Sequence, residues 1–121
     1  MIVKIIAAFV AFAWLSAAHA ARVLEQPERS FEVTLSSLNV PSDAGGGLTF
    51  RNCESCAFST HLLTSSTEYS LNAQVVPFAE FQRIAEELRA DRRASETTVV
   101  AIFVDVDSGR VTRVKIFGEA I

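Results

Sequence analysis

The sequence predicts an α+β protein with a mostly antiparallel sheet of about five to six strands and one long helix packed on one face. Three observations predict this fold. Apolar and polar residues alternate in several short stretches, as in half-buried strands. Residues 77–93 place apolar side chains at helical spacing. Two apolar stretches, 99–104 and 111–117, flank a tight turn that is typical of a hairpin.

The composition is that of one small globular domain. The chain has 121 residues, of which 50% are hydrophobic and 21% charged, and its formal net charge is -3. It is too apolar for a disordered chain and too short for more than one ordinary domain. The acidic balance offers no basic surface, so we expect no nucleic-acid partner. The glycines at 45–47 precede no Lys-Ser or Lys-Thr pair. They therefore predict a flexible turn rather than a phosphate-binding loop, and we expect no cofactor.

The first 20 residues have the three parts of a secretory signal peptide. Lys4 gives a basic start, residues 5–15 are continuously apolar, and residues 18–20 (Ala-His-Ala) match a cleavage site. The apolar run is shorter than the roughly 20 residues that a bilayer requires. We therefore expect cleavage after residue 20 and export to the periplasm or the extracellular space, with no membrane span in the mature chain. An uncleaved interfacial anchor and a buried core helix are the alternatives.

The remaining chain divides into a leader, one domain and a short tail. Residues 21–30 are mixed and polar, and we expect a flexible leader. Residues 31–117 form the domain, and residues 118–121 the tail. Alternation predicts strands at 30–36, 48–51 and 67–76, besides the two strands of the hairpin. Residues 57–65 fit the spacing of a helix and of a strand, although their serines and threonines favour a strand or a loop.

The expected helix, residues 77–93, carries signals at both ends. Pro77 suits the first helical position. Glu80 lies near the positive end of the helix dipole, and Arg92 and Arg93 lie near its negative end. One apolar stripe is formed by Phe78, Phe81, Ile84, Ala85 and Leu88.

The run at 99–104 is apolar on both faces of a strand, as in a central strand that is covered on both sides. We expect one side to face the helix; it consists of Val100, Ile102, Val104 and Val106. The other side consists of Val99, Ala101 and Phe103. Since one helix cannot cover both sides, we predict that this second side binds a protein partner or another copy of the chain. The curl of the sheet or the leader is the alternative cover.

Cys53 and Cys56 form a C-x-x-C motif that two reactions of thiols can use. Outside the cytosol the pair is expected to form a disulfide that closes a tight turn. The spacing also resembles that of thioredoxin-like proteins, which implies thiol–disulfide exchange with Cys53 as the attacking thiol. Arg51 is close enough in sequence to lower a thiol pKa and is a candidate modulator, whereas Glu54 would oppose it.

A third chemistry adds His61 to the pair. The pattern C-x2-C-x4-H resembles the first three ligands of a zinc knuckle, with Ser66 in place of the fourth. The resemblance implies zinc binding through Cys53, Cys56 and His61, with water or Glu68 as the last ligand.

Together these patterns predict a small exported protein that acts by binding or assembly, without catalysis, and that contains a structural Cys53–Cys56 disulfide. Thiol–disulfide exchange and zinc binding are the alternatives. His61 is the only histidine after the predicted signal peptide, and serines are plentiful, so no serine–histidine pair stands out as a catalytic set.

Overall fold

The computed structural model describes residues 27–119 and residue 121. The predicted signal peptide, residues 1–20, and most of the predicted leader lie outside the described residues. The first strand already begins at Glu28, so it includes the end of the stretch expected to be a leader.

The described residues form an α+β fold with two sheets and few helices. The five-stranded sheet contains, in spatial order, β1 (Glu28–Thr34), β7 (Val99–Asp105), β8 (Val111–Phe117), β5 (Glu68–Leu71) and β6 (Gln74–Val76). The three-stranded sheet contains β2 (Leu38–Asn39), β3 (Gly47–Phe50) and β4 (Ser59–Leu62). The helical segments are the 3-10 helix η1 (Leu35–Ser37), α3 (Phe78–Ala90) and α4 (Arg92–Thr97).

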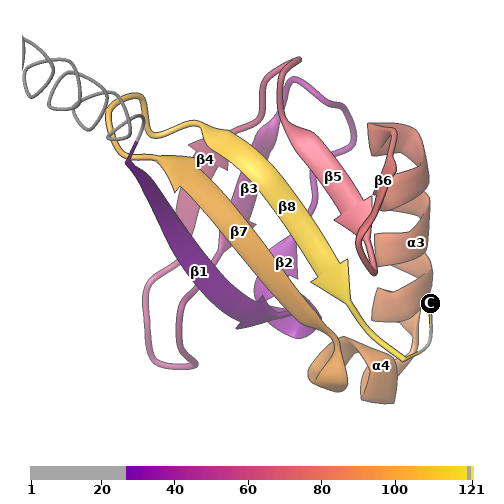
Figure 1. The fold of residues 1–121 in the computed structure, drawn as a ribbon. Helices are drawn as coiled ribbons and strands as arrows, with labels where there is room; N and C mark the ends of the chain where they lie inside the picture. The colour runs from indigo at the N-terminus through magenta and orange to yellow at the C-terminus, as the bar shows by residue number, and fades with distance from the viewer. Residues whose placement is uncertain (1–26, 120) are drawn as a thin grey trace, which may run out of the picture.

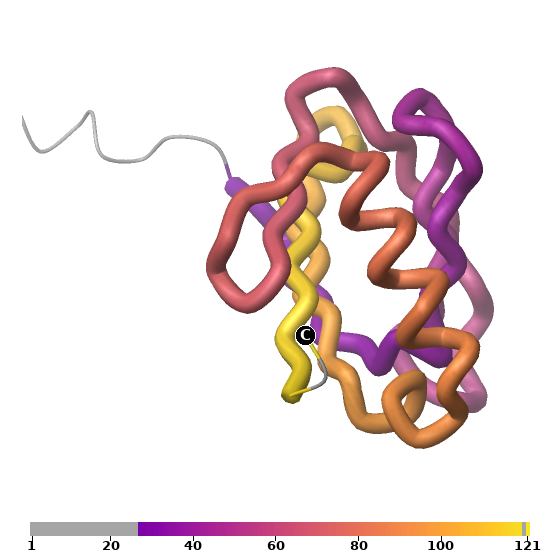
Figure 2. Tube along the Cα trace, turned by 90° about the vertical axis from the view of Figure 1, so that its right-hand side faces the viewer, coloured from indigo at the N-terminus to yellow at the C-terminus, as the bar shows by residue number. Residues whose placement is uncertain are grey.

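The two sheets and α3 enclose one core. Figure 1 looks onto the five-stranded sheet, with the three-stranded sheet behind it and α3 at one side. Figure 2, turned by 90°, shows α3 between the two sheets. The helix contacts both, because Phe81 packs against Tyr69 of β5 at 4.9 Å between ring centroids and Gln82 Nε2 donates to the Pro41 carbonyl, which follows β2. The largest fully buried side chains come from all three layers: Phe50, Phe81, Leu35, Leu38, Leu48, Ile102, Ile116, Val100, Val111 and Val114.

The predicted α+β class is confirmed, but the prediction of a single sheet was wrong. Eight short strands in the described residues divide into two sheets, and β5 pairs with β8 in parallel, whereas the other pairs are antiparallel. Parallel pairing is possible here because a long connection containing a helix runs between β5 and β8. The second sheet also changes the cover of the core, since it shares with α3 the face that one helix was expected to cover alone.

The helix is shorter than expected. It spans Phe78–Ala90, with Pro77 at the N-cap, and the chain is extended at Asp91. The Asp91 carboxylate accepts hydrogen bonds from the backbone N–H groups of Arg93 and Ala94, at 3.0 and 3.4 Å, and caps α4. Aspartate is a favoured N-cap residue, so a second helix begins where a continuous one was predicted.

The closing hairpin is confirmed, with β7 and β8 antiparallel. Val100, Ile102 and Val104 are buried on its inner side, as expected. Val106 does not join them: it is 52% exposed, because the strand ends at Asp105 and Val106 already lies in the turn. Gly109 takes a φ of +71° in this turn, a conformation that glycine adopts without strain.

Candidate functional site

The cysteine pair lies in the loop that joins β3 to β4. Cys53 and Cys56 are bonded to each other, with their Cα atoms 5.0 Å apart. The Cys56 backbone N–H donates to the Cys53 carbonyl at 3.1 Å, so the disulfide spans a single hydrogen-bonded turn. Cys53 is exposed and Cys56 is half-buried. The disulfide therefore cross-links a surface turn, as the sequence predicted.

Arg51, the predicted modulator, contacts the loop rather than either sulfur. Its Nη1 donates to the Glu54 carbonyl at 2.8 Å, and its guanidinium lies 5.0 Å from the centre of the Phe58 ring. Its backbone N–H donates to the Ser37 carbonyl at 3.2 Å. These contacts anchor both ends of the loop and connect it to η1.

The electrostatic surroundings of the pair differ from those of a reactive cysteine. A helix N-terminus lowers a thiol pKa because its backbone N–H groups stabilise the thiolate. Here strands precede and follow the loop. The Ser55 hydroxyl lies 3.6 Å from Cys53 Sγ. The geometry provides a cross-link and one accessible sulfur.

A hollow of about 440 Å³ adjoins the disulfide loop. Cys53 and Val99 both line it, so the structure brings together the cysteine motif and one residue of the predicted partner surface. The remaining lining residues are mostly polar: Glu32, Val33, Thr34, Ser36, Ser37, Arg51, Asn52 and Glu54. Sequence reasoning missed this hollow, because its walls come from the continuous β1–η1 segment, the β3–β4 loop and β7, three parts that are far apart along the chain.

The predicted partner surface lies on the face of the five-stranded sheet that points away from the core. Val99 is 40% exposed and Ala101 is 8% exposed. Phe103 is half-buried, because the guanidinium of Arg113 lies 4.1 Å from its ring centre and the Lys115 ammonium 5.7 Å. These two side chains of β8 supply cover that the sequence did not predict.

His61 connects the two sheets. Its ring stacks on Phe50 at 5.4 Å between centroids, and its Nδ1 lies 3.0 Å from the Gly109 carbonyl in the β7–β8 turn. Within residues 27–119 and 121, no group of three or more histidine, cysteine, aspartate or glutamate side chains is placed to hold a metal ion. Zinc binding by Cys53, Cys56 and His61 would first require reduction of the disulfide, and it stays a prediction.

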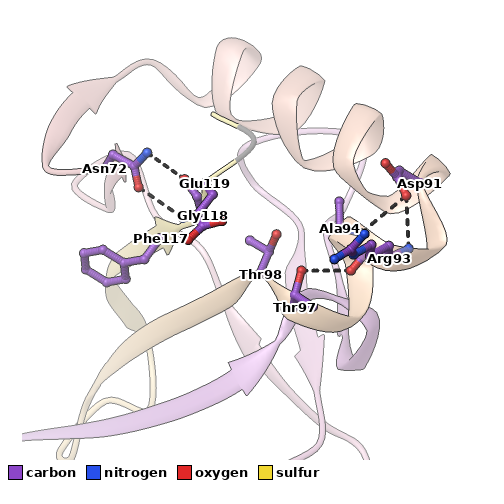
Figure 3. Close-up of a pocket in the computed structure, with 9 residues that line it drawn as sticks. All are labelled: Asn72, Asp91, Arg93, Ala94, Thr97, Thr98, Phe117, Gly118 and Glu119. Carbon is purple, nitrogen blue, oxygen red and sulfur yellow. Dashed lines mark hydrogen bonds between the residues drawn. The ribbon is translucent and has the colours of Figure 1, made fainter.

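A second hollow, of about 650 Å³, lies between the β5–β6 turn, α4 and the end of β8 (Figure 3). Its polar groups are largely bonded to one another. The Asn72 amide donates to the Gly118 carbonyl and accepts from the Gly118 N–H, at 2.9 and 3.1 Å. Asp91 caps α4, and the Thr97 hydroxyl donates to the Arg93 carbonyl at 2.8 Å. The bonds of Asn72 connect the β5–β6 turn to the segment after β8, and the bonds of Asp91 and Thr97 stabilise α4 itself.

The fold and these sites define a small α+β domain with a cross-linked surface loop. Comparisons with protein-family models, with curated proteins and with solved structures found no match to the chain. Within the described part of the chain, none of the helices has the length and apolar character needed to cross a bilayer.

Proposed function

We propose that this is a small exported protein that acts by binding or assembly, without catalysis, and that its Cys53–Cys56 disulfide is structural. The observation that carries the proposal is the position of the disulfide in a hydrogen-bonded turn between two strands. In that position it restricts the conformation of the loop that connects the paired strands β3 and β4. The pattern of residues 1–20 supports export, because it contains the three parts of a signal peptide in order.

The contacts of Arg51 support the structural role. A residue that activates a thiolate would present its guanidinium to the sulfur. Arg51 instead donates to the Glu54 carbonyl and covers Phe58. The loop is therefore held by a covalent bond, a backbone hydrogen bond and a side-chain contact that reinforce one conformation.

Thiol–disulfide exchange is the competing function, and the exposure of Cys53 favours it. In that reaction, once a thiol reductant has reduced the pair, the Cys53 thiolate would attack a substrate disulfide, form a mixed disulfide and release one substrate thiolate. The Cys56 thiolate would then attack Cys53 Sγ and release the second substrate thiolate, so the substrate disulfide is reduced and the protein dithiol oxidised.

Reactivity of the cysteines separates the two functions. We expect the protein isolated from its native compartment to contain a disulfide, to take up alkyl groups only after treatment with a strong reductant, and not to accelerate the reduction of insulin by a thiol. The variant with both cysteines changed to serine is the matched control. Rapid reduction by glutathione, together with insulin reduction above the level of that control, would replace the structural role by exchange.

Intact mass of the same sample tests export. A mass that corresponds to a chain beginning at Ala21, two hydrogens lighter than the dithiol form, is the expected result. A soluble product that retains Met1 and takes up two alkyl groups would overturn both the export and the disulfide. Zinc retained after reduction and lost in a His61→Ala variant would instead support the metal-binding alternative.

A further inference from the structure

The outer face of the five-stranded sheet combines apolar and charged residues in an ordered pattern. Figure 1 looks onto this face, and none of the described elements lies across β1, β7 and β8. Cross-strand register defines its rows. In one row Glu32 pairs with Ala101, which pairs with Lys115; in the next Ser30 pairs with Phe103, which pairs with Arg113. A third row pairs Thr34, Val99 and Phe117.

Charge on β1 and β8 is segregated by strand on this face. The acidic residues Glu28 and Glu32 lie on β1, and the basic residues Arg113 and Lys115 lie on β8. Two further acidic residues share the face: Asp105 ends β7, where its carboxylate is hydrogen-bonded within the β7–β8 turn, and Glu68 of β5 lies beside Arg113. Strands are spaced by about 4.8 Å, so the acidic and basic columns are about 10 Å apart. One ion pair already forms between the two columns within a single chain, since Arg113 Nη2 lies 2.8 Å from Glu28 Oε2. Glu32 is exposed, and no ion pair is formed by it or by Lys115 within the described chain.

We propose that this face binds a second copy of the chain, about a two-fold axis that runs along β7. This inference rests on the binding or assembly role proposed above, for which it names the partner. A rotation of 180° about that axis places β7 of one copy over β7 of the other. It also places β1 of each copy over β8 of the other. Glu32 of each copy then lies over Lys115 of the other, so the face is complementary to itself.

The charges also exclude the other simple arrangement. A two-fold axis that runs across the strands would place β1 over β1 and β8 over β8. Glu32 would then face Glu32, and Lys115 would face Lys115. Like charges at such distances are unfavourable when water is excluded. The columns on β1 and β8 therefore favour the axis along β7. The like pair that this axis leaves, Asp105 over Asp105 at the end of β7, involves carboxylates that are already hydrogen-bonded within their own turns.

The middle of the proposed interface is the set of residues that the sequence indicated. Ala101 provides a small side chain at the centre of the Glu32–Lys115 row, which lets the two sheets approach. Val99 and Phe117, 40% and 43% exposed, form an adjacent apolar pair that the second copy would cover. Phe103, held under Arg113, completes the apolar column along the axis.

The order of the strands leaves room for this packing. Because β1 is at the edge of the sheet, the second copy extends over β1, β7 and β8 and leaves β5 and β6 beside it. Three strands of seven residues form a small patch by the standard of specific interfaces. We therefore expect a weak dimer, with a dissociation constant on the order of 10–100 µM at low salt.

Charge reversal gives the sharpest test. Sedimentation velocity on the purified product of the full sequence, from about 1 to 500 µM, is expected to show a concentration-dependent monomer–dimer equilibrium. Glu32→Lys alone and Lys115→Glu alone each place like charges opposite one another twice per dimer. Each is expected to weaken association by at least about tenfold. The double variant, Glu32→Lys with Lys115→Glu, restores opposite pairs and is expected to return association to within about threefold of the original.

Glu86→Lys is the matched control, because Glu86 is exposed on α3, away from this face. It changes the net charge as Glu32→Lys does and is expected to leave association unchanged. Circular dichroism confirms that each variant is folded. A chain that is monomeric throughout this range, or a double variant that does not recover, overturns the proposed dimer. Neither result affects the disulfide or export, which are tested by alkylation and mass.

Discussion

The two sheets are stabilised in different ways. In the five-stranded sheet, β1, β7 and β8 are seven residues long, and the inner residues of β7 and β8 are completely or almost completely buried. In the three-stranded sheet the strands have two to four residues. Leu48 and Phe50 of β3 are buried, but β4 exposes 55% of Leu62. The large sheet is therefore buried repeatedly along its central strands β7 and β8, whereas its edge strands and the small sheet are buried at a few positions.

Local links replace burial in the small sheet. The disulfide closes the β3–β4 loop, and the hydroxyls of Thr49 and Thr60 form a cross-strand hydrogen bond of 2.8 Å. At Gly47 an added Cβ would lie 2.5 Å from Thr60 Cγ2, so any larger residue there would displace the Thr60 side chain. A sheet that depends on such links can be perturbed locally, by redox state or by loop contacts, without loss of the whole core.

The largest expected effect is in the large sheet. Ile102→Ala removes a fully buried side chain from β7 and is expected to lower the free energy of unfolding by about 2–5 kcal/mol, because it leaves a cavity in the shared core. Urea denaturation followed by circular dichroism measures it. Val99→Ala on the same strand is the control, and a loss of less than about 1 kcal/mol is expected for this exposed residue. Equal losses would contradict the role given to inner-face burial.

Removal of the disulfide is expected to have an intermediate effect. Changing Cys53 and Cys56 to serine frees a loop of four residues, for which the chain-entropy relation gives a loss of roughly 2 kcal/mol. Hydrogen exchange is expected to increase mainly in β3 and β4, while β7 and β8 keep their protection. A reducing agent should have no further effect on the serine variant. Faster exchange throughout both sheets would show that the small sheet is not an independent region.

Periodicity predicted the parts of the fold that depend on local pattern. The closing hairpin and the buried side of β7 follow directly from the run at 99–104 and the turn after it. The division into two sheets does not, because pairing of strands as short as β2 and β3 depends on contacts with the rest of the core. The break at Asp91 had a local signal, a favoured capping residue, but the arginines beyond it matched the dipole of a longer helix.

The candidate sites show the same limit. The motif itself indicated Cys53 and Cys56, and alternation placed Val99, Ala101 and Phe103 on one face. The register of β8 was needed to place Arg113 and Lys115 over Phe103, and no local pattern encodes that register. The hollow shared by Cys53 and Val99 likewise depends on which strands become neighbours.

Tyr69 places a polar hydroxyl in the apolar core against the large sheet. Its hydroxyl is buried and makes no hydrogen bond of ordinary geometry, although the Thr67 hydroxyl is near enough to lower its pKa and its ring packs on Phe78 and Phe81. Tyr69→Phe removes this unsatisfied group and is expected to raise stability by about 1 kcal/mol. Urea denaturation near pH 7 measures the gain. Unchanged or lower stability would indicate that the hydroxyl is satisfied, for example by water.

The same residue predicts a dependence on alkaline pH. Desolvation raises the pKa of the Tyr69 phenol above its ordinary value near 10, and the neighbouring Thr67 hydroxyl offsets only part of the shift. The folded state thus disfavours the phenolate. The neutral Tyr69 phenol therefore makes its full contribution to stability below pH 10. This contribution is lost as the pH rises from there towards the folded-state pKa of Tyr69. Tyr69 is the only tyrosine, so ultraviolet absorbance of the phenolate reports its titration alone. An ordinary pKa in the folded protein would contradict this prediction.

The smallest effect is expected at the edge of the large sheet, in the β5–β6 turn. Asn72 and Ala73 have φ values of 46° and 71°, in the left-handed region. Ala73 is strained there, since two-residue hairpin turns of this hand favour Asn-Gly. Ala73→Gly relieves the strain but frees the unfolded chain, so a net gain of about 0.5 kcal/mol is expected in thermal or urea denaturation.

Asn72→Gly is the matched control for that substitution. It relaxes an equally unusual backbone but removes both hydrogen bonds from the Asn72 amide to Gly118, so a net loss of stability is expected. If both glycine variants were stabilised, backbone strain would dominate this edge and the bonds to Gly118 would contribute little. If neither changed, the turn would already be open in the folded state. The opposite signs expected here would show that the long-stranded sheet, like the short one, relies on local polar links where burial ends.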